Sequence, residues 1–189
     1  MKKIAILASG SGSNAEQIAL HFRNSSQACV DIILTNNEKA GVIDRAGRLE
    51  IACQTFHRDE FRNPTGVLQL LIDRNIDIIV LAGFLLLVPE HIVQHFKGKM
   101  LNIHPALLPD FGGKGFYGNH VHQAVVDAGA IMSGITIHQV NERFDEGDIV
   151  FQAACFVDPS DTAEALAVKI HALEHAYFPV VIEKFLRTQ

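Results

Sequence analysis

Short runs of β-branched and aliphatic residues alternate with helical patterns through the first hundred residues of the chain. The strand-like runs cover residues 3–8, 30–35 and 77–82, and the helical segments cover residues 14–22, 41–49 and 64–74. Asn63 and Pro64 mark the start of the third helix, since asparagine caps free N–H groups and proline fits the first helical position. Because parallel strands need a crossover between them, the alternation predicts βαβ units in a parallel sheet.

The pattern becomes less regular after about residue 100. We expect a short helix at 89–96, a strand at 100–104, a helix near 120–128, strands near 133–140 and 149–156, and a last helix near 162–185. The two strands that end near 140 and begin near 149 leave no room for a crossover helix and should pair antiparallel. The expected fold class is therefore α/β, with a Rossmann-like, mostly parallel twisted sheet flanked by helices and an antiparallel extension in the C-terminal half.

Composition excludes several classes of function. The 189 residues are 48% hydrophobic, which suits one compact domain over residues 1–189. Lys and Arg number 16 against 21 Asp and Glu, so the net charge of −5 disfavours nucleic acid as a partner. The longest apolar run, 78–88, is too short to span a bilayer, which argues against a membrane segment. The three cysteines are widely spaced and odd in number, which favours a reducing, cytoplasmic location.

A glycine-rich turn follows the first predicted strand. Its sequence is Ser9-Gly10-Ser11-Gly12-Ser13-Asn14. Small residues let a ligand approach the backbone, and the helix that follows offers free N–H groups to an anion, so the turn is a candidate phosphate site. Its serine and asparagine side chains favour a single phosphate monoester. Gly10-x-Gly12-x-x-Ala15 also satisfies a relaxed dinucleotide fingerprint with Glu38 as the ribose acid, so an NAD-dependent oxidoreductase is the alternative.

A second group of polar residues follows the strand predicted at 100–104. Strand alternation places Asn102 and His104 on one face, at the carboxyl end where open α/β sheets bind ligands. An amide beside an imidazole can stabilise an oxyanion and move a proton, which acyl transfer to an amine requires. A carboxylate that would orient the imidazole is available later in the chain, where Asp145, Glu146 and Asp148 are the candidates.

Taken in order, these motifs resemble the phosphoribosylglycinamide formyltransferase family of folate-dependent enzymes. The motifs are Gly-x-Gly-Ser-Asn at 10–14, Leu-Ala-Gly-Phe at 81–84, Asn-Ile-His-Pro at 102–105 followed by Leu-Leu-Pro at 107–109, and Asp-x-Gly-x-Ile at 145–149 with Gln152. The resemblance implies transfer of a formyl group from 10-formyltetrahydrofolate to the amine of glycinamide ribonucleotide, giving formylglycinamide ribonucleotide in de novo purine biosynthesis. It implies that Asn102, His104 and Asp145 are the catalytic residues, because the register of the last motif selects Asp145.

The resemblance also implies two binding pockets and no metal, in a monomer or a homodimer. It places a nucleotide- and phosphate-binding half at residues 1–100 and a catalytic and folate-binding half at 101–189. The ribonucleotide would bind Gly12, Ser13, Asn14 and Glu174. The folate would bind Leu85, Leu86, Leu87 and Val88 together with Asn102. The His-x-x-Glu-His sequence at 171–175 also fits a zinc pattern, but a third ligand is lacking nearby.

Two segments depart from the family pattern. The family usually carries a basic residue within the 85–88 loop, and its absence here leaves Arg58 and Arg62 as candidates for the folate's glutamate tail. The glycine-rich segment 111–118 is longer than in many relatives and has the composition of a mobile lid. Lys114, within this segment, is a candidate contact to an anionic ligand.

Overall fold

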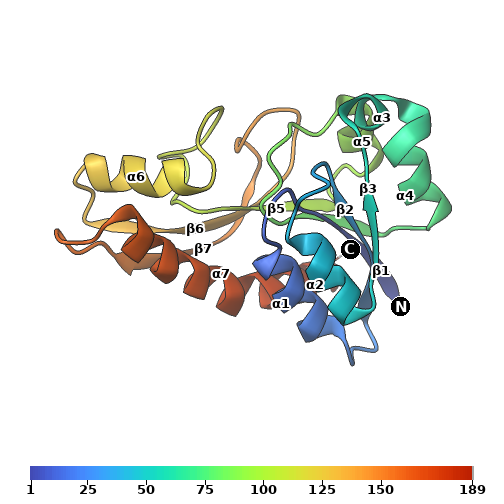
Figure 1. The fold of residues 1–189 in the computed structure, drawn as a ribbon, viewed down its shortest axis with the longest axis horizontal. Coiled ribbons are helices and arrows are strands. Elements are labelled where there is room, and N and C mark those ends of the chain that lie inside the picture. Colours follow the sequence, from blue (N-terminus) through green and yellow to red (C-terminus); the bar gives the residue numbers. More distant parts are fainter. Residues whose placement is uncertain (189) are drawn as a thin grey trace.

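One mixed seven-stranded sheet forms the centre of the computed structural model, which describes residues 1–188 (Figure 1). In chain order the strands are β1 (Lys2–Leu7), β2 (Ala28–Thr35), β3 (Ala52–Thr55), β4 (Ile78–Leu81), β5 (Met100–His104), β6 (Met132–Gln139) and β7 (Ile149–Phe156). Their spatial order is β3-β2-β1-β4-β5-β6-β7. The pairs from β3 to β5 are parallel, whereas β6 pairs antiparallel with both β5 and β7. The expected mostly parallel sheet with an antiparallel C-terminal extension is confirmed.

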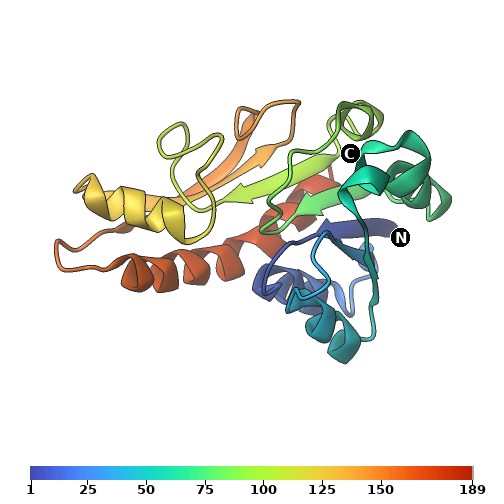
Figure 2. The ribbon, with the colours of Figure 1, turned by 45° about the horizontal axis from the view of Figure 1, so that its top comes forward.

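Helices cover both faces of this sheet (Figures 1 and 2). They are α1 (Ser13–Phe22), α2 (Val42–Leu49), α3 (Arg58–Arg62), the wide helical turn η1 (Pro64–Leu68), α4 (Gln69–Asp73), α5 (Glu90–His95), α6 (Asn119–Asp127) and α7 (Ala163–Leu186). Side chains of β1 divide the core between the faces. Ile4 and Ile6 pack with α1, α2 and α7, while Ala5 and Leu7 pack with the segment from α3 to α5. Such alternating burial of neighbouring residues is what a two-sided parallel sheet requires.

The region between β2 and β4 differs from the sequence prediction. The single helix expected at 64–74 is divided into η1 and α4, because Gly66 has non-helical backbone angles. A Cβ at Gly66 would lie 2.1 Å from the carbonyl oxygen of Glu60, so the close approach of α3 requires glycine. Asn63 caps the first of the two segments as predicted, accepting from the Thr65 N–H at 3.0 Å. The short strand β3 and helix α3 were not predicted.

The last helix, α7, is long and apolar, although charged residues interrupt its apolar sequence. Within residues 1–188, α7 is the one helix long and apolar enough to cross a membrane by length and composition. Its buried residues pack into the protein core; they include Leu166, Ile170, Phe178 and Ile182. The helix contacts α1, α6 and the strands β5 to β7. This packing accounts for its apolar composition.

Candidate active site

A cavity of about 530 Å³ lies at the carboxyl ends of β1, β4 and β5. Its lining includes the residues that the resemblance implied for catalysis and for binding the ribonucleotide and the folate ring, namely Gly12, Ser13, Asn14, Leu85, Leu86, Leu87, Val88, Asn102, His104, Asp145 and Glu174. The glycine-rich turn, the 85–88 loop and the polar residues of β5 therefore share one space. These segments are far apart in the sequence but lie together in space, because the parallel strands place their carboxyl ends at one edge of the sheet.

The glycine-rich turn forms one end of the cavity. Gly12 has a left-handed backbone (φ 77°), and a Cβ there would lie 2.4 Å from a side-chain carbon of Val42. Helix α2 braces the turn, since the Val42 N–H donates to the Gly10 carbonyl at 3.2 Å and Arg45 Nε donates to the Ser11 carbonyl at 2.8 Å. Among residues 1–188, no side chain caps the start of α1. The free N–H groups of its first turn and the helix dipole make this end suitable for a phosphate.

Glu174 lies beside the phosphate end and is only 5% exposed. Its Oε2 accepts a hydrogen bond from Asn14 Nδ2 at 2.9 Å and lies 2.9 Å from His171 Nδ1. The hydrogen bond to Glu174 raises the pKa of His171 above its ordinary value. Within residues 1–188, no three His, Cys, Asp or Glu side chains are grouped as a metal site would require. The carboxylate of the His-x-x-Glu-His sequence instead joins α7 to the start of α1.

The 85–88 loop forms an apolar part of the cavity wall. Leu85 and Leu87 are 49% and 45% exposed, whereas Val88 is buried and Leu86 packs against the core. Ser9 joins this loop to the glycine-rich turn. Its Oγ accepts from the Leu85 N–H at 3.0 Å and donates to Asn36 Oδ1 at 2.6 Å. Two of the four apolar residues thus present surface to the cavity, while the other two anchor the loop.

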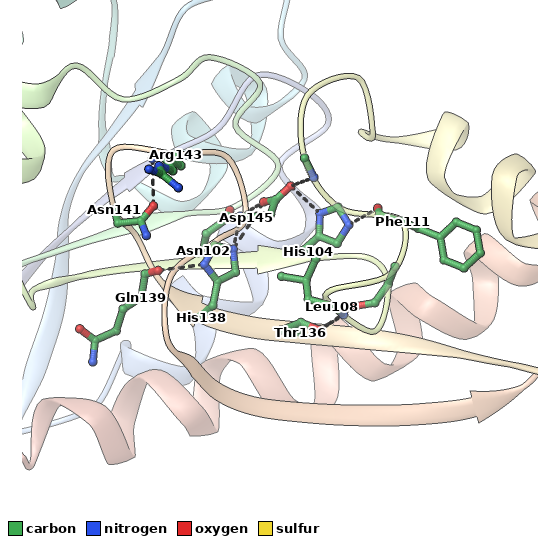
Figure 3. Close-up of polar contacts among 12 residues, drawn as sticks. Asn102, His104, Leu108, Phe111, Thr136, His138, Gln139, Asn141, Arg143 and Asp145 are labelled. Carbon is green, nitrogen blue, oxygen red and sulfur yellow. Dashed lines mark hydrogen bonds and ion pairs between the residues drawn. The ribbon is translucent and has the colours of Figure 1, made fainter.

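Asn102 is held by groups from two other segments (Figure 3). Its Nδ2 lies 3.0 Å from His138 Nε2 and 3.4 Å from Asp145 Oδ1. The reverse amide orientation would place an oxygen against the carboxylate, so the nitrogen faces both groups. His138 Nδ1 lies 2.9 Å from the Gln139 carbonyl and donates to it, and Nε2 lies 3.5 Å from Asp145 Oδ1. The amide nitrogen of Asn102 therefore lies between His138 Nε2 and Asp145 Oδ1.

His104 is 3% exposed and has protein groups beside both ring nitrogens (Figure 3). Nε2 donates to the Phe111 carbonyl at 2.8 Å, and Nδ1 lies 3.5 Å from Asp145 Oδ2. Burial lowers the pKa of His104 below its ordinary value, although the Asp145 charge opposes this. Burial thus favours the neutral ring, whereas the Asp145 carboxylate favours the protonated ring, in which the Nδ1–H faces the carboxylate.

Asp145 lies at the centre of this polar group. Burial raises its pKa, but His138, His104 and the Gly113 N–H, which donates at 3.0 Å, outweigh burial, so the pKa of the carboxyl lies below its ordinary value. The residue has a left-handed backbone (φ 57°) in the loop between β6 and β7. That loop approaches β6 so closely that a Cβ at Gly147 would lie 1.7 Å from the Gln139 carbonyl oxygen. Glycine at 147 is what allows Asp145 to reach His104 and His138.

Among the polar residues of the site, His138 was not singled out from the sequence. His138 is opposite Asn102 in the antiparallel register of β5 and β6, and this pairing was the signal that could have located it. His122 and His171 also line the cavity, as does Lys114. A second cavity of about 690 Å³ shares the 85–88 loop and Lys114 and is also lined by Arg58 and Arg62.

Glu38, which the dinucleotide alternative needs, is not among the lining residues of the first cavity. Its side chain is 73% exposed and lies 3.9 Å from His57. A ribose bound in the cavity would therefore lack the acid that dinucleotide-binding sites place near the glycine turn.

Comparisons with known proteins agree with this geometry. Residues 2–182 match the family model described as formyl transferase. The phosphoribosylglycinamide formyltransferase of Bacillus subtilis is 35% identical, over 98% of this chain and 95% of that protein. The chloroplastic enzyme of the same name from Arabidopsis thaliana is 38% identical over 96% of this chain, which spans 64% of that longer protein.

Solved structures give the same result. The crystal structure of phosphoribosylglycinamide formyltransferase from Bacillus halodurans superposes with a TM-score of 0.88 at 35% identity, over 98% of this chain and 95% of that one. The Brucella melitensis structure of the same name also has a TM-score of 0.88 at 35% identity, over 98% of this chain and 95% of that one. The chain therefore belongs to the formyl transferase family, in the branch of the phosphoribosylglycinamide formyltransferases.

Proposed function

We propose that this protein transfers the formyl group of 10-formyltetrahydrofolate to the amine of glycinamide ribonucleotide, with Asn102, His104 and Asp145 as its catalytic residues. The observation that carries the proposal is the single cavity, whose lining combines the start of α1, the apolar 85–88 loop and the polar group of Asn102, His104 and Asp145. A phosphate monoester suits the start of α1, and a flat pteridine suits the apolar loop.

In the reaction, a bond forms between the amine nitrogen and the formyl carbon, and the bond from that carbon to the folate nitrogen N10 breaks. The carbonyl oxygen becomes an oxyanion in between. One Nδ2 hydrogen of Asn102 is held only by the 3.4 Å contact to Asp145, which is long for a hydrogen bond, so a formyl oxygen can compete for it. The contact with His138 holds the amide nitrogen in place, as preorganised stabilisation of the oxyanion requires.

His104 and Asp145 supply the proton transfers. The attacking amine gives a proton to His104, and protonated His104 gives that proton to N10 as N10 leaves. His104 Nδ1 is the acceptor, because its lone pair is not shared with a donor and protonation turns the 3.5 Å contact with Asp145 into an ion pair. The ionised Asp145 thereby compensates for the burial that keeps His104 neutral at rest.

The glutamate tail of the folate extends from the apolar wall into the second cavity. Leu85 to Val88 line both cavities, so a ligand packed on this loop can enter either. Arg58, Arg62 and Lys114 provide cations there for carboxylates, in place of the basic residue that the loop lacks.

Formyl transfer is tested by incubating the purified protein with glycinamide ribonucleotide and 10-formyltetrahydrofolate, with and without a chelator and with no added metal. The expected result is formylglycinamide ribonucleotide at the same rate in both reactions. Absence of product from folded protein that binds a folate analogue would overturn the proposal. Ligand-observed NMR with NAD tests the oxidoreductase alternative, because saturation transfer to NAD at the level seen for the folate analogue would support that activity instead.

The cellular location that we propose is cytoplasmic. Cys29, Cys53 and Cys155 are all free thiols in the structure, which suits a reducing compartment.

A further inference from the structure

His122 is a buried histidine whose position the formyl-transfer steps leave unexplained. It lies on α6, is 3% exposed and lines the first cavity. Its ring is 6.4 Å from that of His171, the α7 residue that lies against Glu174. His122 Nδ1 is buried and has no hydrogen-bond partner. Buried polar atoms of this kind are uncommon, and one beside a ligand cavity needs an explanation.

The burial of Nδ1 determines which hydrogen-bonding groups His122 offers. Burial lowers the pKa of His122, and the neighbouring His171 lowers it further, so the ring is neutral near pH 7. A buried N–H without an acceptor is costly, and the proton is therefore placed on Nε2. Nε2 is not among the buried atoms that lack a partner, so it is the nitrogen that reaches the cavity surface. His122 thus presents a donor to the cavity.

Glu174 presents the complementary group. Its Oε2 is shared by Asn14 and His171, and among the residues described its Oε1 has no hydrogen-bond partner. The carboxylate can only accept, and neutral His122 can only donate through Nε2. A hydroxyl is the group that donates to one of these partners and accepts from the other.

We propose that His122 Nε2 and Glu174 Oε1 together bind one ribose hydroxyl of the ribonucleotide, with His122 as a specificity-determining residue that distinguishes the ribonucleotide from its deoxy analogues. The proposal rests on the proposed function, because it takes glycinamide ribonucleotide as the ligand of this end of the cavity. A sugar without that hydroxyl leaves both the donor and the carboxylate oxygen buried without partners, and this loss is the source of the discrimination.

The test is calorimetric titration with glycinamide ribonucleotide and its 2′-deoxy and 3′-deoxy analogues. The parent protein is expected to bind one of the two analogues at least about tenfold more weakly than the ribonucleotide. His122→Phe is expected to lose about three- to tenfold in affinity for the ribonucleotide and nothing for that same analogue. His122→Gln, which retains a donor, is expected to recover part of the loss.

His120→Phe is the matched control, because His120 is an exposed histidine on the same helix and does not line the cavity. Its affinities should be those of the parent. Folate-analogue binding reports folding of each variant, and the measurements on the parent need no variant at all. Equal affinity of the parent for all three nucleotides would overturn the role of His122, as would a loss in His122→Phe that is the same for all three. Failure of the parent to bind or formylate the ribonucleotide would instead overturn the proposed function.

Discussion

Gly147→Ala tests whether the loop between β6 and β7 positions Asp145, the carboxylate that we propose to be catalytic. The added Cβ would lie 1.7 Å from the Gln139 carbonyl oxygen, and real Cβ contacts stay beyond 3.0 Å. That carbonyl lies 2.9 Å from His138 Nδ1, and the Gln139 N–H donates to the Asp148 carbonyl at 2.9 Å, so β6 cannot yield easily. The loop must therefore move away by more than about 1 Å, and a shift of that size at a catalytic group typically costs about 10²-fold in rate.

We expect kcat for formyl transfer to fall about 10²-fold in Gly147→Ala, and the affinity for glycinamide ribonucleotide to change much less. Overpacking of this kind should also lower the free energy of unfolding by about 1–3 kcal/mol. Steady-state kinetics, calorimetric titration and urea unfolding measure the three quantities. Gly47→Ala is the control, because Gly47 lies within α2 with no heavy atom within 4 Å of a Cβ, and it should retain parental kcat. A Gly147→Ala protein with parental kcat would refute the positioning role. So would a further large loss when Gly147→Ala is added to Asp145→Ala, since positioning acts through Asp145.

Three further predictions concern the catalytic residues, the apolar wall and pH. Alanine substitution of Asn102, His104 or Asp145 should lower kcat by about 10²–10³-fold, and the triple variant should lose little more than the most impaired single variant. Losses that multiply would show that the three residues act independently. Leu87→Asp should weaken binding of a folate analogue about tenfold or more in calorimetric titration, because the carboxylate opposes burial under an apolar ligand, whereas Leu20→Asp, at an equal exposure of 45%, should leave it unchanged. Burial lowers the pKa of His122 below its ordinary value of 6.5, so near this pH the unfolded chain binds more protons at His122 than the folded protein does. The contribution of His122 to the free energy of unfolding is therefore fully present above about pH 6.5 and is lost as the pH falls. The urea midpoint of the parent should therefore fall more steeply than that of His122→Gln between pH 7 and 5, and parallel curves would contradict the lowered pKa.

The buried strands could be predicted from the sequence because their composition carries a strong local signal. β5 and β7 begin and end where the pattern placed them, and the other central strands deviate by one or two residues. β3 has no such signal, since Ala52–Thr55 is a largely exposed edge strand without β-branched apolar alternation. The division of the helix expected at 64–74 depends on Gly66 meeting α3, which is a tertiary contact that no local pattern contains.

The parts of the candidate site that come from one contiguous motif could be predicted from the sequence. The parts that tertiary structure brings together could not. Asn102 and His104 are two residues apart on one strand, so alternation alone places them together. His138 could be linked to Asn102 only through the antiparallel pairing of β6 with β5. That pairing was not foreseen, because α6 lies between these strands and a parallel crossover was equally compatible with the chain. The orientation of His104 also depends on the Phe111 carbonyl, a backbone group that side-chain motifs do not reveal.

Ser9 links two regions that line the cavity, the 85–88 loop and the glycine-rich turn. Its hydroxyl joins the 85–88 loop to the strand that leads into the glycine-rich turn, and its N–H donates to the Gly83 carbonyl at 3.0 Å. A ligand that orders either region therefore restricts the motion of the other, and the second ligand has less conformational entropy left to remove. Such linkage is reciprocal, so each substrate should raise the affinity for its partner by the same factor. On the proposed assignment of ligands, a single serine hydroxyl would thus connect occupancy of the ribonucleotide region to occupancy of the folate region.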